Sequence, residues 1–451
     1  MYQAYQQNFL DSIAHVKNNI VKDPHGERVL SGRMILKGGM VVDPYNQKEM
    51  ETDIAIIADE IVEVSDVIPE EKGDVIIPCD GLLVVPGLID AHLHLGDLFE
   101  TSVQPIFEAA QDGVTMAFSP GAGNTFMAPS LLAAEVDRGI PLNIGLLLGA
   151  PNILGTMLDV EELIALFKGE LAEETAAQKM TRNVFAYLNS PFIIGLKDHM
   201  GHYIMPDEKI DAIYEITSKA NLMFMSHTQC PEHANRIVEL SKGRKLHLAH
   251  ATAPGGGTHG DPVNAMKTVM ELCKLENVSA EFVTSMLRPG LGNRDGLLMT
   301  KASQQVAYDA LEAGVVKILN SDGQSAATMK GFGDTRDNIP ALLEIVEAGI
   351  LSLQDSIATM TANVAELMTQ ITKNPWWSEK VGHLGVGALA NVTIIDRRDK
   401  MATYTIVNGN LVAFENRIIR SGNGAGRLVS KFGTLRNLGI GHLPMFSYKN
   451  D

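Results

Sequence analysis

Two histidines with metal-binding spacing follow an apolar stretch. In LLVVPGLIDAHLH, residues 82–94, a buried strand leads into His92 and His94. Alternate residues of a strand face the same side, so both imidazoles can point toward one ion. Neutral imidazole is the commonest metal ligand in proteins. A lone His-x-His pair fits two half-buried histidines equally well, and the other side chains in the chain must decide between these readings.

The elements that position these histidines are apolar strands alternating with helix-like segments. After the first strand, the segments VTMAFSP, LNIGLLLGA, FIIGLK, LMFMSH, KLHLAHA, VSAEFVTSML and VVKILNSDG follow in order. Repeated strand–helix units form parallel sheets, and eight such strands close a TIM barrel. We therefore predict an α/β fold whose centre is a (β/α)8 barrel.

Polar side chains occur at the ends of several predicted strands. They are His92 and His94 after the first strand, then Lys197, His227, His250 and Asp322. Reactive groups of TIM barrels lie at the carboxyl ends of the strands, so these six side chains should meet at one rim. His247, three residues before His250, should be out of phase with it and face the helices.

This ordered set resembles the amidohydrolase superfamily, in particular its binuclear, dihydroorotase- and hydantoinase-like branch. The resemblance covers about residues 33–420. It implies that His92 and His94 bind the more buried of two divalent metal ions and that His227 and His250 bind the more exposed one. The His/carboxylate ligand set favours Zn²⁺, although manganese, iron or cobalt would also suit it. The resemblance further implies that Lys197, carboxylated by carbon dioxide, bridges both ions as a carbamate, and that Asp322 ligates the inner ion. The alternative for Lys197 is an ion pair with Asp198.

The resemblance also implies a mechanism. Two ions sharing a water lower its pKa, so that hydroxide forms near neutral pH. Asp322 then accepts the proton and delivers it to the leaving nitrogen. The bond would be an amide, cyclic amide or N-acyl C–N bond of a small molecule, although an ester could leave in the same way.

Residues in the loops after the strands are candidates for substrate contacts. Tyr203 could donate to the developing oxyanion, a catalytic role similar to that of a loop tyrosine in hydantoinase-like relatives. The candidates for substrate binding are His199, His202, His259, Arg288 and Asn293. Each of them also fits an ordinary solvated loop.

Composition narrows the class of protein. The net charge of −17 argues against binding to nucleic acid or to anionic membranes. Three cysteines are too few for a disulfide framework and fit the reducing cytoplasm. We expect no signal peptide, because the N-terminus has no basic start followed by an apolar core, and no membrane span, because no run of 18 apolar residues occurs.

Strand-rich blocks at both ends of the chain predict a second domain. We expect a small β-sandwich from residues 31–84 and 383–425 around a barrel of residues 85–382. Residues 1–30 should form a helical extension and residues 426–451 a tail, which by analogy favour a homo-oligomer. The acidic helical insertion at about residues 151–190 fits a lid, a subunit contact or a solvated surface hairpin.

Two other functions remain open from the sequence. One is a superfamily deaminase of a purine- or pyrimidine-like heterocycle, which usually needs one metal and no bridging lysine. The other is a non-catalytic, hydantoinase-like assembly protein that has lost its ligands. The presence of Lys197 argues against the first, and the complete set of six ligands argues against the second.

Overall fold

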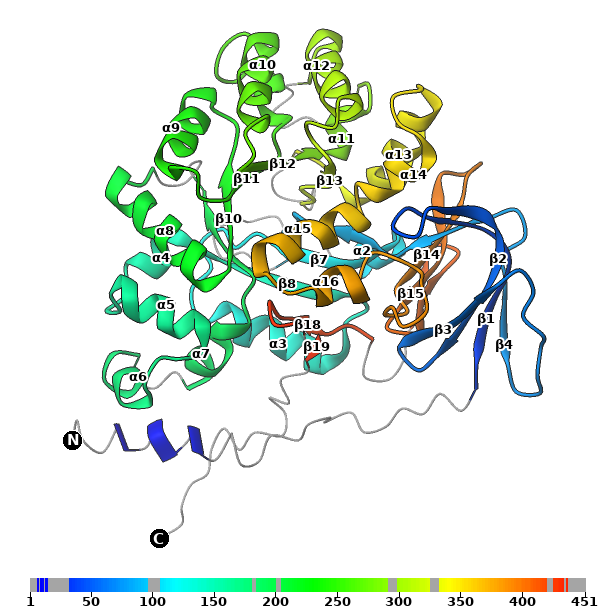
Figure 1. The fold of residues 1–451 in the computed structure, drawn as a ribbon, viewed down its shortest axis with the longest axis horizontal. Helices are drawn as coiled ribbons and strands as arrows, with labels where there is room; N and C mark the ends of the chain where they lie inside the picture. Colours follow the sequence, from blue (N-terminus) through cyan, green and yellow to red (C-terminus); the bar gives the residue numbers. More distant parts are fainter. Residues whose placement is uncertain are drawn as a thin grey trace.

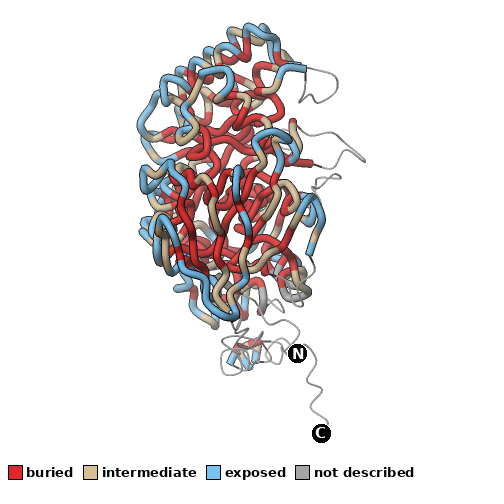
Figure 2. Tube along the Cα trace, turned by 90° about the vertical axis from the view of Figure 1, so that its right-hand side faces the viewer, coloured by how far each residue is buried: buried red, intermediate tan, exposed pale blue. Residues whose placement is uncertain are grey.

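The computed structural model consists of a helix-covered barrel with a β-rich part at one side (Figure 1). It describes residues 6–14 apart from 8 and 12, and residues 32–95, 106–180, 184–199, 204–290, 298–324, 332–419, 425–433 and 435–436. Buried residues fill the interior of the molecule, and exposed residues lie mainly on the helices and loops at its surface (Figure 2).

Eight parallel strands form the barrel in sequence order. They are β6 (Leu88–Asp90), β7 (Val114–Ser119), β8 (Asn143–Gly149), β9 (Gly195–Asp198), β10 (Met223–His227), β11 (Leu246–Ala249), β12 (Val278–Val283) and β13 (Ile318–Asn320). The first and last strands meet just beyond their carboxyl ends, where Leu93 bridges to Gly323. The predicted TIM barrel is therefore confirmed.

A mixed sheet joins the two ends of the chain. Its strands are β1 (Met34–Asp43), β2 (Lys48–Ile57), β3 (Glu60–Ser65), β4 (Val75–Pro78), β5 (Leu83–Pro86), β14 (Val392–Asp396), β15 (Met401–Val407), β16 (Asn410–Phe414) and β17 (Arg417–Ile418). The two halves meet where β14 pairs antiparallel with β5. The prediction of a β domain built from both ends is confirmed, and β5 spans the predicted boundary between residues 84 and 85.

Gly87 is the single residue between β5 of the mixed sheet and β6 of the barrel. A Cβ at this position would lie 2.3 Å from Oγ1 of Thr115 on β7. Only glycine therefore allows the chain to pass so close to the neighbouring strand. This close passage places the strand that leads to His92 directly beside β7.

Helices cover the outside and one end of the barrel. The helices are α2 (Ile106–Gln111), α3 (Ala128–Gly139), α4 (Ala150–Leu154), α5 (Val160–Lys168), α6 (Glu173–Lys179), α7 (Val184–Asn189), α8 (Asp207–Ala220), α9 (Pro231–Ser241), α10 (Pro262–Cys273), α11 (Thr284–Leu287), α12 (Lys301–Glu312), α13 (Asn338–Glu347), α14 (Leu353–Ala358), α15 (Ala362–Thr372) and α16 (Trp376–Lys380). Short 3₁₀ turns span Ser190–Phe192, Ala253–Gly256 and Thr335–Asp337.

Helices α4 to α7 account for the insertion predicted at residues 151–190. Helix α5 begins with a capping box in which the side chains of Asp159 and Glu162 each accept the other's backbone N–H, and it ends at Gly169 in the left-handed conformation. Its buried residues, Leu163 and Phe167 among them, belong to the main hydrophobic cluster. The insertion is thus, at least at α5, part of the packed helical layer.

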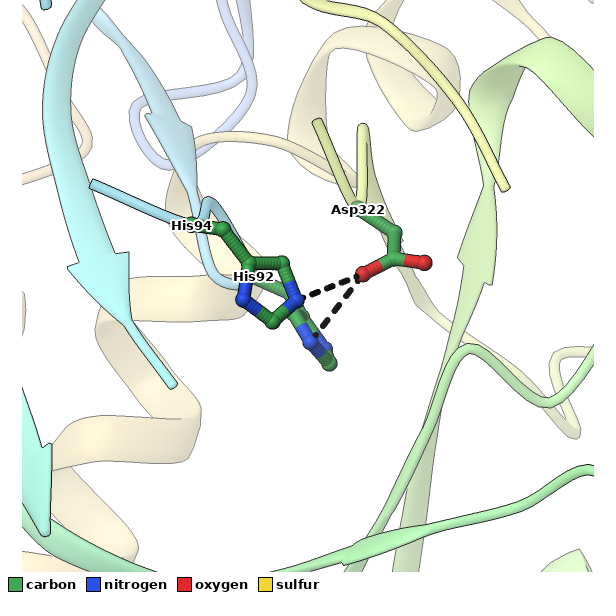
Figure 3. Close-up of side chains that lie close together, drawn as sticks. All are labelled: His92, His94 and Asp322. Atoms are coloured by element: carbon green, nitrogen blue, oxygen red, sulfur yellow. Dashed lines mark hydrogen bonds and ion pairs between the residues drawn. The ribbon is translucent and has the colours of Figure 1, made fainter. Parts of the chain in front are cut away.

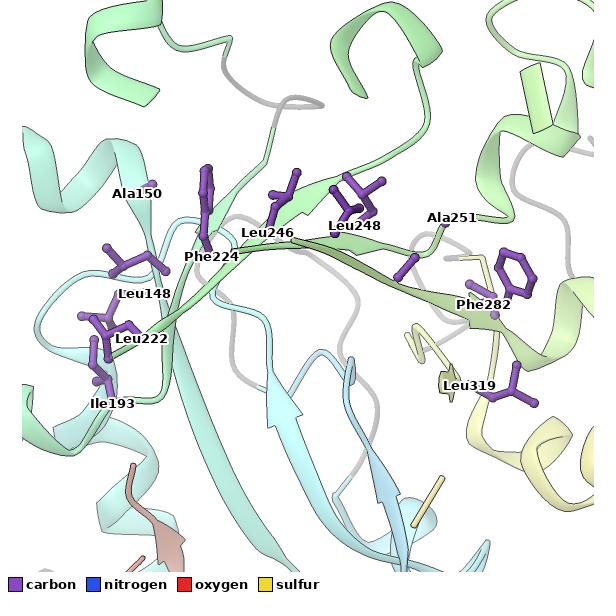
Figure 4. Packing of buried hydrophobic residues seen from close by; sticks show 14 of the residues in the cluster. Leu148, Ala150, Ile193, Leu222, Phe224, Leu246, Leu248, Ala251, Phe282 and Leu319 are labelled. Carbon is purple, nitrogen blue, oxygen red and sulfur yellow. The ribbon is translucent and has the colours of Figure 1, made fainter. Parts of the chain in front are cut away.

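Two apolar layers hold the barrel together. Side chains on the outer faces of the strands, including Leu148, Phe224, Leu248 and Phe282, pack in the layer between strands and helices (Figure 4). A separate cluster inside the barrel joins Met116 and Phe118 to Met368 of α15 and to Trp377 of α16. Helices α15 and α16 therefore close one end of the barrel, and the polar residues gather at the other.

Described residues near both ends of the chain contact the body. Among residues 6–14, Phe9 and Ile13 are helical and buried, and the ring centroid of Phe9 lies 6.1 Å from that of Tyr187. Near the C-terminus, β18 (Leu428–Val429) pairs in parallel with β8 and antiparallel with β19 (Leu435–Arg436). None of the helices in the described ranges is long and apolar enough to cross a bilayer.

Candidate metal centre

His92, His94 and Asp322 converge at the carboxyl ends of the first and last barrel strands (Figure 3). Oδ1 of Asp322 lies 3.2 Å from Nε2 of His92 and 3.2 Å from Nε2 of His94. All three side chains are buried, and one ligand atom from each lies within 4.8 Å of the others. Two imidazole nitrogens and a carboxylate oxygen at this spacing can hold a divalent metal ion.

Lys197, on β9, lies in the same cluster and is fully buried. Its Nζ is 3.4 Å from Nε2 of His92. The carboxylate of Asp198 instead accepts hydrogen bonds from the Ser226 hydroxyl at 3.0 Å and from His233 at 2.8 Å. Neighbouring strand residues point to opposite faces, and these contacts favour the metal-site position of Lys197 over an ion pair with Asp198.

His227 and His250 extend the cluster on the side of β10 and β11. Their ring centroids are 4.4 Å apart, and the centroid of His250 lies 5.3 Å from that of His92. Among the described residues, Nδ1 of His250 is buried without a hydrogen-bond partner. Burying a ring nitrogen without a hydrogen-bond partner costs free energy. A bound metal ion would supply the missing partner, so this nitrogen fits a metal ligand.

Backbone strain marks two of these residues. His250 has φ of 38° and Asp322 has φ of 45°, both in the left-handed region that non-glycine residues seldom adopt. Both lie just beyond their strands, where the turn rather than the pleat sets the direction of the side chain. Such strain clusters at functional sites, where the surrounding structure enforces it.

The protonation of the cluster also suits metal ligation. Burial, reinforced by the nearby Lys197, holds the pKa of His92 well below its usual range. Burial together with His227 and Lys197 does the same for the pKa of His250. Both imidazoles are therefore neutral near pH 7, and the neutral form is the one that binds metal.

Asp90 connects the strand ends of this rim, although no pattern in the sequence indicated a role for it. Its carboxylate accepts the backbone N–H groups of His92 and Ser321 and the side-chain amide of Asn338, each at 3.2 Å. Burial raises the pKa of Asp90 to about 6 against the opposing effect of these hydrogen bonds. Asp90 thereby ties the strand end of His92 to that of Asp322. The available signal was a carboxylate inside an otherwise apolar strand.

Of the predicted substrate contacts, His199 lies beside the cluster, with its ring centroid 5.0 Å from that of His227. His259 is exposed on its loop. The Arg288 guanidinium pairs with Glu344 at 2.9 Å and also contacts Asp337. Tyr203, His202 and Asn293 lie outside the described residues.

The predicted orientation of His247 is wrong. Its Nε2 lies 3.0 Å from Oε2 of Glu281, inside the barrel rather than among the helices. His250 does not continue the strand alternation, because β11 ends at Ala249 and His250 has a positive φ. Counting the pleat back from His250 therefore assigned His247 to the wrong face.

Comparison with known proteins identifies the family. A profile described as "Amidohydrolase family" matches residues 83–412, which include the barrel and all six predicted ligands. The chain belongs to this amidohydrolase family. A dihydroorotase of Carboxydothermus hydrogenoformans is 24% identical over 425 residues, covering 80% of this chain and 88% of that protein.

Solved structures agree with this amidohydrolase fold. A crystal structure of a D-hydantoinase superposes with a TM-score of 0.67 at 17% identity, covering 89% of this chain and all of that one. A dihydropyrimidinase from Brevibacillus agri gives 0.66 at 17% identity, with coverage of 89% and 99%. These likenesses confirm the barrel with its appended β domain.

The family settles the class of reaction. Amidohydrolases of this kind are metal-dependent hydrolases acting on C–N bonds, so the prediction of a metal-binding amidohydrolase is confirmed. The family also implies a binuclear site for divalent ions, and the donor set fits it: four imidazoles, an aspartate and the buried Lys197 gather at the carboxyl ends of the barrel strands.

Proposed function

We propose that this amidohydrolase opens the cyclic amide of a small heterocycle at a binuclear metal centre. The observation that carries the proposal is the convergence of His92, His94 and Asp322 within 4.8 Å, with Nζ of Lys197 only 3.4 Å from His92. The similar proteins named dihydroorotase, D-hydantoinase and dihydropyrimidinase support a cyclic amide as the substrate class.

In this proposal each ligand has a defined place. His92, His94 and Asp322 hold the inner ion, and His227 and His250 hold the outer one. Lys197 carries a carbamate that bridges the two, and its complete burial favours the neutral amine from which a carbamate forms. Imidazole and carboxylate ligands suit Zn²⁺, which we propose as the native metal.

When bound, the two ions polarise the scissile carbonyl and acidify the attacking water. The chain's own residues move the proton. Asp322 accepts it from the water and then donates it to the ring nitrogen as the amide bond breaks. Because Asp322 is fixed beside both histidines, this carboxylate needs little reorganisation between the two steps.

Residues of the loops after the strands contact the substrate in this proposal. Tyr203 donates to the developing oxyanion, and His199, His202, His259 and Asn293 recognise the ring. Arg288 is the weakest candidate, since two carboxylates already engage its guanidinium. We also propose a cytoplasmic homo-oligomer with the domain limits given above.

The deciding experiment is turnover of a substrate panel by zinc-loaded protein. The panel contains hydantoins, dihydropyrimidines, N-acyl amino acids, isoaspartyl dipeptides and lactams, with adenine and cytosine derivatives as deaminase substrates. We expect hydrolysis of a cyclic amide, loss of activity after chelation, and recovery when about two equivalents of Zn²⁺ per chain are restored.

The other functions give different results in the same assay. A deaminase would release ammonia from an amino-substituted heterocycle at one metal equivalent. An assembly protein would bind no metal tightly and turn over none of the panel. If the protein preferred the N-acyl amino acids, the proposed metal centre would still hold, but N-acyl amides would replace cyclic amides as the substrate class.

A further inference from the structure

A buried carboxylate lies behind the metal cluster, on the side of His92 away from Asp322. Glu281, on β12, is fully buried, and its Oε1 is 2.6 Å from Nδ1 of His92. The other ring nitrogen of His92, Nε2, lies 3.2 Å from Asp322 and 3.4 Å from Lys197. His92 is therefore held at one nitrogen by Glu281 and presents the other to the site.

Two further donors fix Glu281 in place. The backbone N–H of His250 donates to Oε1 at 3.3 Å, and His247 Nε2 lies 3.0 Å from Oε2. The other ring nitrogen of His247 lies 2.8 Å from the Ser279 hydroxyl. A carboxylate oxygen only accepts, so both histidines must donate N–H to Glu281. Both oxygens of Glu281 are thus committed.

We propose that Glu281, anchored by His247, is a positioning residue for the metal centre. It holds His92 in the tautomer with the proton on Nδ1, so that the lone pair of Nε2 points at the inner ion. Carboxylate partners of this kind orient ligating histidines and increase their basicity, and their removal typically weakens metal binding about 10–100-fold. The inference rests on the metal site of the proposed function.

The same contacts connect Glu281 to ligands of both proposed metal ions. It touches the side chain of His92, an inner ligand, and the backbone of His250, an outer ligand. One residue therefore sets the direction of one imidazole and the start of the strained turn that carries another.

The test compares metal affinities of variants by competition with a chelator, together with the absorption spectrum of the Co²⁺-loaded protein. Glu281→Gln keeps the shape of the side chain but replaces one carboxylate oxygen by an amide NH₂. This group cannot accept a hydrogen bond from the N–H donors that contact Glu281. We expect the inner ion of this variant to bind about 10–100-fold more weakly, with a shifted cobalt spectrum. Neither readout depends on turnover.

His247 supplies a second pair of variants in case Glu281→Gln does not fold. His247 borders a cavity of about 50 Å³ at the amino ends of β10, β11 and β12, which gives a substituted side chain room. His247→Leu removes a donor to Glu281 and should weaken the inner ion, whereas His247→Gln restores a donor and should return affinity toward the wild-type value.

His233→Leu is the matched control. His233 is also buried and lies 2.8 Å from a buried carboxylate, that of Asp198, but touches none of the six ligands through any contact described above. The His233→Leu variant should lose stability while keeping wild-type metal affinity.

Wild-type affinities and cobalt spectra in both Glu281→Gln and His247→Leu would overturn the inference and leave the proposed function standing. A wild-type protein that binds no divalent ion overturns both.

Discussion

Oδ1 of Asp322 lies 3.2 Å from Nε2 of His94, although 228 residues separate them in the chain. The contact exists because the last barrel strand closes onto the first: the backbone N–H of His94 donates to the carbonyl of Gly323 at 3.2 Å. Closure of the barrel and assembly of the cluster of His92, His94 and Asp322 are therefore one structural event.

Replacing Asp322 by Asn should separate proton transfer from metal binding. The amide oxygen can still face the metal, but the side chain no longer accepts a proton from water. We expect kcat to fall by about 10²–10⁴-fold while the metal content of saturated protein changes little. Steady-state kinetics and metal analysis of the same preparations test this, and a variant retaining a tenth of wild-type kcat would contradict the assigned role.

Lys197→Ala should remove the bridge between the two ions. Because Lys197 is fully buried, we expect removal of its side chain to leave space for a small carboxylic acid. We expect the metal content to drop below two equivalents per chain, activity to be lost, and acetate or propionate to restore part of both. Lys197→Arg is the control, since it fills the space but cannot be carboxylated. One equivalent with full activity in Lys197→Ala would exclude the carbamate.

Asp112 should make stability depend on pH away from the metal site. Burial raises the pKa of Asp112 to about 7, and a hydrogen bond from the Thr335 hydroxyl only partly opposes this. The folded state then keeps a proton that the unfolded state releases above about pH 4, so this contribution to stability is lost as the pH rises toward 7.

Asp112→Asn removes that titration while keeping a hydrogen-bonding side chain. We expect the free energy of unfolding of the variant, relative to that of the wild type, to be larger at pH 8 than at pH 5. Urea unfolding of both proteins at the two pH values measures the difference in their free energies of unfolding. Contributions from the metal ligands cancel in this difference, because both proteins carry the same ligands. An equal gap between the two proteins at both pH values would show that Asp112 ionises normally.

Lys431 should anchor the segment near the C-terminus. Its buried Nζ donates to the carbonyl of Ala220 at 2.8 Å and to that of Phe167, at the ends of α8 and α5. Lys431→Met leaves both carbonyls without this donor and should lower the free energy of unfolding by about 1–3 kcal/mol. Lys168→Met, at an exposed ion pair with Glu170, should change it by less than about 0.5 kcal/mol.

The alternation of apolar strands with helical segments was sufficient to predict all eight barrel strands and the rim where His92, Lys197, His227 and Asp322 meet. The reason is that a parallel strand carries its own signal, a short apolar run, and the fold brings every carboxyl end to the same rim. The joining of both chain ends into one β domain followed from the family resemblance and the two strand-rich blocks.

Only the tertiary structure decided what lies behind the ligands. Glu281 is 189 residues from His92, and Asp90 is 231 residues from Ser321. Nothing local distinguishes a buried carboxylate that accepts such distant donors from an ordinary polar residue in a strand. The direction of His247 was misjudged for a related reason: His250 takes its orientation from a strained turn, which depends on contacts with Glu281 that residue spacing does not encode.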